Sequence, residues 1–61
     1  MEYRDIRTGQ RVVLQGGVEG EVVEVDPRRL ETGDPVRVRM RLPVTGTHTV
    51  WMDPGHLTPR G

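Results

Sequence analysis

The chain has 61 residues, in which nine arginines balance nine acidic residues and neither lysine nor cysteine occurs. A chain of this length forms one domain, and the absence of cysteine excludes disulfide bonds and thiolate metal sites. Because the net charge is zero, the protein as a whole is not attracted electrostatically to nucleic acid or to an anionic membrane, which argues against non-specific binding to either.

Composition favours an all-β protein. Valine is the commonest apolar residue, alanine and phenylalanine are absent, and eight glycines and five prolines divide the chain. β-branched side chains suit strands, whereas glycine and proline mark turns. No apolar run approaches the roughly 20 residues of a membrane-spanning helix, and no apolar signal segment is present at the N-terminus. We therefore expect a cytoplasmic protein.

The first half of the chain predicts two strands. Residues 1–7 form a polar lead-in whose Tyr3 and Ile6 we expect to cover one end of the fold, and residues 8–10 form a turn. A strand follows at residues 11–15 and ends at two consecutive glycines, which adopt positive φ values without strain. The second strand covers residues 20–26, where a doublet of valines shifts the alternation by one residue and indicates a β-bulge.

Residues 27–35 are the longest connection. Pro27 lacks the amide proton that a sheet requires, and the segment ends in turn residues. The third strand, at residues 36–42, has the clearest pattern in the chain, because arginines alternate with apolar residues. Val36, Val38, Met40 and Leu42 are predicted to face the core, and Arg37, Arg39 and Arg41 to face water.

The last part of the chain predicts a turn at residues 43–47, a fourth strand at 48–52 and a short closing strand at 58–60. Between these strands, Asp53 is placed to cap a single helical turn with Pro54 at its first position. Five short strands with one 3-10 turn before the last is the order of an SH3-like barrel. We assign residues 1–61 to one such domain, with its barrel core at about 6–60 and no linker. The alternative OB-fold needs a helix that residues 43–47 cannot supply.

Residues 9–14, Gly16 and residues 20–25 (GQRVVL, G and GEVVEV) resemble the KOW-type branch of SH3-like barrels. The resemblance implies a module that binds RNA, or a polymerase or ribosome partner. The glycine-containing loop of that family often carries basic residues that touch phosphate. Glu19 and Glu21 stand there in this chain, which argues against RNA contact through the loop because carboxylates repel phosphate.

Residues 9–12, 20–23 and 50–54, together with Leu57, also resemble the plasmid-borne dihydrofolate reductases, small SH3-like barrels that assemble as tetramers around one pore. The resemblance implies a Gln, an Ile and a Tyr on the strand at residues 49–52. None of the three occurs there.

The arginines at positions 37, 39 and 41 are candidate binding residues. Side chains two apart on a strand lie on one face about 7 Å apart, a spacing that suits a row of phosphates or carboxylates. The alternative, which we favour, is that they pair across strands with Glu21, Glu24 and Asp26 of the second strand.

Three further candidates are Arg28 and Arg29 in the long connection, where SH3-like barrels commonly meet ligands, and Trp51. The loop arginines are either ligand contacts or solvated charges. Trp51 faces outward if Val50 and Met52 fill the core, and is itself central in the opposite register. We expect it to be partly exposed, because Trp is rarely wholly buried.

The sequence excludes serine and cysteine nucleophiles, since it contains neither residue. The spacing of His48, Asp53 and His56 follows no known ligand motif, so we expect no metal and no cofactor. These observations favour a non-catalytic SH3-like binding module whose partner is a protein rather than bare nucleic acid, with binding at Arg28, Arg29, Arg37, Arg39, Arg41 and Trp51. The alternatives are a KOW-like module that binds RNA or a ribonucleoprotein, and a self-associating barrel, including a pore-type reductase.

Overall fold

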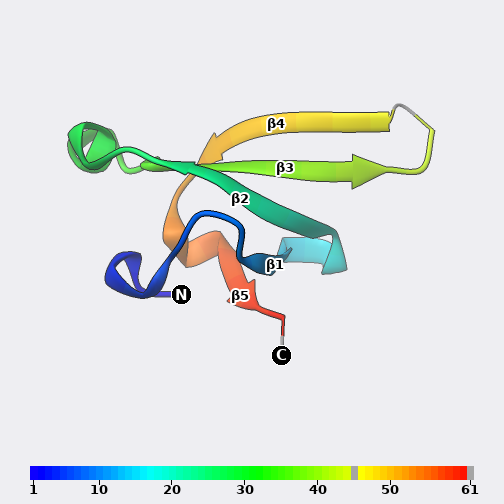
Figure 1. Cartoon of the computed structure of the whole chain (residues 1–61), viewed down its shortest axis with the longest axis horizontal. Helices are drawn as coiled ribbons and strands as arrows, with labels where there is room; N and C mark the ends of the chain where they lie inside the picture. Colours follow the sequence, from blue (N-terminus) through cyan, green and yellow to red (C-terminus); the bar gives the residue numbers. More distant parts are fainter. Residues whose placement is uncertain (45, 61) are drawn as a thin grey trace.

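The chain forms one antiparallel sheet of five strands in the computed structural model, which describes residues 1–44 and 46–60. The strand order is β4-β3-β2-β1-β5, and Figure 1 shows the β3–β4 hairpin running along the long axis of the molecule. The all-β prediction is confirmed. The strands are β1 (Arg11–Leu14), β2 (Glu19–Val25), β3 (Val36–Leu42), β4 (Gly46–Met52) and β5 (Leu57–Pro59).

The sheet is open, with β4 at one edge and β5 at the other. No pairing joins these two strands within the described residues, so the sheet does not close into a barrel. β5 has three residues, which pair with β1. β4 has seven residues and contains no Asp, Glu, Lys or Arg. It is therefore a long uncharged edge, whereas natural edge strands are often protected by charges, proline or shortness.

The predicted β-bulge in the second strand is confirmed. Val22 lies opposite Val38, but the next pair is Glu24 with Arg37, so the register between β2 and β3 shifts by one residue. The shift keeps Val22 in the core while Glu21 and Glu24 both lie beside arginines of β3. The valine doublet thus lets one strand keep an apolar inner side and an acidic outer side.

The described residues contain four 3-10 segments, of which the first precedes β1 and the others lie between strands: η1 (Tyr3–Asp5), η2 (Gln15–Gly17), η3 (Pro27–Thr32) and η4 (Pro54–His56). Only η4 was predicted, and the Asp53 carboxylate accepts a hydrogen bond from the amide of Gly55 at 2.7 Å as expected of an N-cap. η3 begins with the same Asp-Pro pair, and the Asp26 carboxylate accepts a hydrogen bond from the amide of Arg28. Across the described ranges, the helical segments are all too short and too polar to cross a membrane.

The core is small and consists mostly of valine. Its buried residues are 0–3% exposed and come from the lead-in and from four strands: Ile6, Val12, Val22, Val36, Val38 and Leu57. The predicted inner face of β3 is confirmed for Val36 and Val38, but Met40 and Leu42 are only half-buried. Their end of the β3–β4 hairpin projects beyond the rest of the sheet (Figure 1), so no second layer covers it.

Candidate functional site

The outer side of β3 carries the three arginines predicted there, which face water as expected. Arg37 pairs with Glu24 (Nη1 to Oε1, 3.5 Å), and Arg39 pairs with Glu21 (Nη2 to Oε1, 2.8 Å). Arg37 and Arg39 therefore form the cross-strand ion pairs that were the favoured alternative. All four side chains are about half exposed, so each pair contributes about 1 kcal/mol or less to stability.

Trp51 lies on the same side of the sheet as these arginines, directly opposite Arg37 in the β3–β4 register. It is half-buried, and the Arg29 guanidinium carbon stands 4.1 Å from the centroid of its ring. The guanidinium carbon of Arg37 is 5.9 Å from the same centroid. We call Arg29, Arg37 and Trp51 the Trp51 cluster. The expected partial exposure of Trp51 is confirmed, although Val50 beside it is 40% exposed and does not fill the core.

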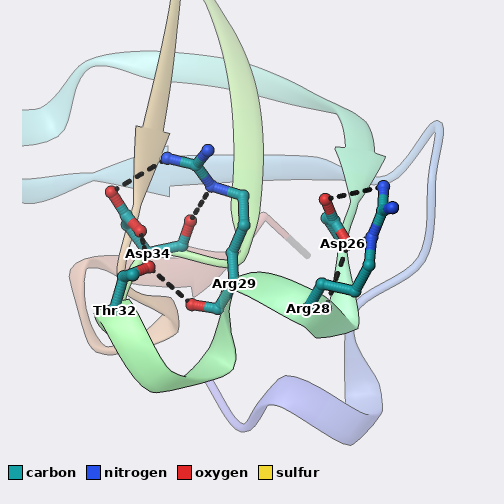
Figure 2. A network of polar contacts seen from close by, with 5 residues as sticks. All are labelled: Asp26, Arg28, Arg29, Thr32 and Asp34. Carbon is teal, nitrogen blue, oxygen red and sulfur yellow. Dashed lines mark hydrogen bonds and ion pairs between the residues drawn. The ribbon is translucent and has the colours of Figure 1, made fainter.

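The Arg29 side chain is held in position by Asp34, which follows η3. Its Nε donates to the carbonyl oxygen of Asp34 at 3.2 Å, and its Nη2 pairs with the Asp34 carboxylate at 3.3 Å. The hydroxyl of Thr32 lies within hydrogen-bonding distance of the same carboxylate and of the Arg29 carbonyl (Figure 2). Contacts that order a side chain before binding reduce the conformational entropy that is lost when a partner binds.

Arg28 is not part of the Trp51 cluster. Its side chain points toward Asp26, whereas that of Arg29 points toward Asp34 (Figure 2). The Nε of Arg28 lies 3.2 Å from the Asp26 carboxylate. Its side chain is 89% exposed, whereas that of Arg29 is 37% exposed. The structure thus separates two neighbouring arginines that look equivalent in the sequence. It also moves Asp26 away from the β3 arginines with which it was expected to pair.

The carboxylates of this loop predict a dependence of stability on pH. The hydrogen bonds from Arg28 lower the pKa of Asp26, and the hydroxyl of Thr32, followed by the charge of Arg29, lowers the pKa of Asp34. A pKa lower in the folded than in the unfolded chain means that the unfolded chain binds more protons in acid. The stabilisation is therefore present above about pH 4 and is lost as the pH falls through the folded-state pKa values.

We accordingly expect the midpoint of urea unfolding to fall as the pH is lowered from about 5 to about 3. The fall should be smaller in the double variant Asp26→Asn, Asp34→Asn, which keeps the shape of both side chains but cannot ionise at either position. Equal pH dependence in the two proteins would contradict the assignment of these carboxylates.

A second feature of the outer side is an open groove of about 360 Å³ that spans β1, β2, β3 and β4. We call it the arginine groove. Two of its arginines pair with glutamates: Arg39 with Glu21, and Arg60 with Glu19 (Nε to Oε1, 3.2 Å). The lining residues are Arg11, Glu19, Gly20, Glu21, Arg39, Arg41, Thr47 and Arg60.

Of the four arginines in the groove, Arg39 and Arg41 are predicted binding candidates, whereas Arg11 and Arg60 are not. Arg11 lies opposite Glu21 in the β1–β2 register, and the amide of Arg60 donates to the carbonyl of Arg11. The pairing of β1 with β2 places Arg11, and the return of β5 beside β1 places Arg60. Only the alternation of Arg11 with the buried Val12 indicated that this arginine faces away from the core.

Comparisons with protein-family models, with curated proteins and with solved structures give no match to this chain.

Proposed function

We propose that this chain is a non-catalytic binding module of the SH3-like, KOW-related type that docks on a partner protein through the Trp51 cluster. The observation that carries the proposal is the half-buried Trp51 ring with the Arg29 guanidinium stacked at 4.1 Å. Trp and Arg are enriched among the few interface residues that supply most binding energy. Because the hydrogen bonds to Asp34 already hold the Arg29 side chain, a partner has less of it to order on binding.

The position of Trp51 on β4 also supports a protein partner. β4 is an edge strand, so the backbone amides and carbonyls along its free edge, away from β3, have no strand partner within the described residues. An extended peptide segment uses such groups by adding a strand to the sheet, with side-chain pockets supplying specificity. Trp51 and Thr49 lie on the same face of the sheet as the β3 arginines, and their side chains would then contact those of the added strand on that face.

Charge favours a protein over bare nucleic acid. Glu19, Glu21 and Glu24 lie on β2 between the basic residues of the outer side, and they repel a phosphate backbone laid across the sheet. A stable protein interface needs only about 800 Å² from each partner. The KOW-like alternative remains an RNA contact, which nuclease treatment distinguishes in the experiment below.

The proposal predicts that Trp51→Ala lowers the affinity for the partner by about 30-fold or more, the usual effect of truncating a central interface residue. Arg29→Gln should also weaken binding, because it removes the group stacked on the ring. Arg28→Gln is the matched control, since it causes the same loss of charge on the neighbouring residue without touching the cluster. The measurement is co-purification from native cell extract with each variant as bait, followed by titration of the recovered protein.

Recovery of the same protein by the wild-type and Arg28→Gln baits, with loss by the Trp51→Ala and Arg29→Gln baits, would support the proposal. Equal recovery by all four baits would contradict it, as would recovery that nuclease treatment abolishes. Sedimentation of the purified chain across concentration should accompany the experiment, because a second copy of the chain could pair with the same β4 edge.

A further inference from the structure

The arginine groove concentrates positive charge in a protein whose net charge is zero. Four arginines and two glutamates line it, which leaves an excess of two positive charges. The glutamates each pair with one arginine, Glu21 with Arg39 and Glu19 with Arg60. Over residues 1–44 and 46–60, no carboxylate lies within 4.0 Å of the guanidinium groups of Arg11 or Arg41. Two cationic groups of the groove are therefore available to a ligand.

The strand register brings these two groups to one hollow from different strands. Arg11, Glu21 and Arg39 are opposite one another on β1, β2 and β3, so the backbones at Arg11 and Arg39 are about 10 Å apart. Arg41 lies two residues beyond Arg39, and Thr47 is opposite Arg41 on β4. Long arginine side chains reach across such distances, and the Thr47 hydroxyl adds a neutral hydrogen-bond donor.

We propose that the arginine groove binds the phosphate monoester group of a small phosphorylated compound. Such a group carries a charge of about −1.5 to −2 at neutral pH, which matches the excess of two positive charges. Its oxygens accept paired hydrogen bonds from the planar guanidinium group, a geometry that arginine provides and lysine does not. The described residues that line the groove include no Val, Leu, Ile, Met, Trp or Tyr, so the ligand is recognised through its charged group.

A single phosphate group fits the groove better than a nucleic-acid backbone does. The acidic residues of β2 continue along the outer side from Glu19 through Glu21 to Glu24. A chain of phosphates that left the groove in that direction would approach these carboxylates, whereas one terminal dianion stays beside Arg11 and Arg41. The site requires no residue of the Trp51 cluster, and so it is independent of the proposed function.

The test is a titration of the ¹⁵N-labelled protein with glycerol 1-phosphate at near-physiological salt, followed by two-dimensional NMR. Glycerol serves as the uncharged counterpart, and a short single-stranded oligonucleotide supplies phosphodiesters. We expect saturable shifts of the amides of Arg11, Gly20, Arg41 and Thr47 with glycerol 1-phosphate and none with glycerol. Absence of saturable shifts, or shifts spread over the whole surface, would overturn the proposal. Tighter binding of the oligonucleotide at the same amides would overturn it in favour of a nucleic acid.

Some variants are expected to weaken phosphate binding and another to strengthen it. A folding defect can only weaken binding, so the variant with stronger binding separates the two causes. Arg41→Gln and Arg11→Gln should each weaken binding by about tenfold, because each removes charge-assisted hydrogen bonds. Glu19→Gln should strengthen binding severalfold, since it releases Arg60 from its ion pair and raises the excess charge to three. Arg28→Gln lowers the net charge equally but lies outside the groove, so it should leave the affinity unchanged. Equal weakening by Arg28→Gln and Arg41→Gln, or weaker binding in Glu19→Gln, would contradict the site.

Discussion

Replacing Leu57 with alanine is expected to lower the free energy of unfolding by about 2–5 kcal/mol, the range found for buried leucines. Leu57 is the largest of the fully buried side chains in the described part of the chain, and it packs with Ile6 and four valines. Natural domains have about 0.05–0.15 kcal/mol of stability per residue, or about 3–9 kcal/mol for this length. The variant should therefore lie close to the limit of folding at room temperature.

The measurement is urea unfolding followed by the fluorescence of Trp51, which lies outside the core and remains present in the variant. Val44→Ala is the control, because Val44 is 93% exposed and its truncation should change stability by less than about 0.5 kcal/mol. If Leu57→Ala does not fold, Leu57→Val should show an intermediate loss. A loss of less than about 1 kcal/mol in Leu57→Ala would mean that this side chain does not fill the core as described.

Replacing Gly20 with alanine is expected to lower the free energy of unfolding by about 1–3 kcal/mol through overpacking. A Cβ atom at Gly20 would stand 2.7 Å from Cγ1 of Val38 and 3.1 Å from Cδ1 of Leu14. Val38 is fully buried, and a β-branched side chain has few rotamers to which it can move. Gly20 has no positive φ value, so the expected cost arises from this contact rather than from backbone strain.

A double-mutant cycle identifies that cause. In a Val38→Ala background the contacting methyl group is absent, so Gly20→Ala should cost about 1 kcal/mol less than it does in the wild type. Unfolding midpoints of the four proteins, measured under one set of conditions, supply the comparison. An equal cost in both backgrounds would show that Val38 is not the residue against which the new methyl group clashes.

The local elements of this fold were largely predictable from the residues. The third strand coincides with its predicted range, 36–42, because arginine alternates strictly with apolar residues there, and this period of two fits a strand with one buried face. The doublet Val22 and Val23 predicted the bulge for the same reason. The 3-10 segment at Pro27–Thr32 differs from the irregular connection that the sequence predicts, although Asp26 before Pro27 repeats the capping signal seen at Asp53.

The candidate sites were only partly predictable, because they depend on contacts between residues far apart in the chain. Arg28 and Arg29 are neighbours with identical side chains, and only the return of the chain through Asp34 places one of them over Trp51. Arg60 joins the groove because β5 pairs with β1, which no local pattern specifies. Whether the sheet closes was likewise beyond local reasoning.

Sequence alone therefore determined the strands to within two residues at each end, the inward and outward faces of β3 and the cap at Asp53, since side-chain alternation and turn chemistry act over a few residues. The tertiary structure decided strand partners, the open edges and the gathering of arginines into two surfaces. Those features depend on the order in which the strands pair. That order is set by which arrangement buries the apolar side chains of all the strands together in one core, and no single segment specifies it.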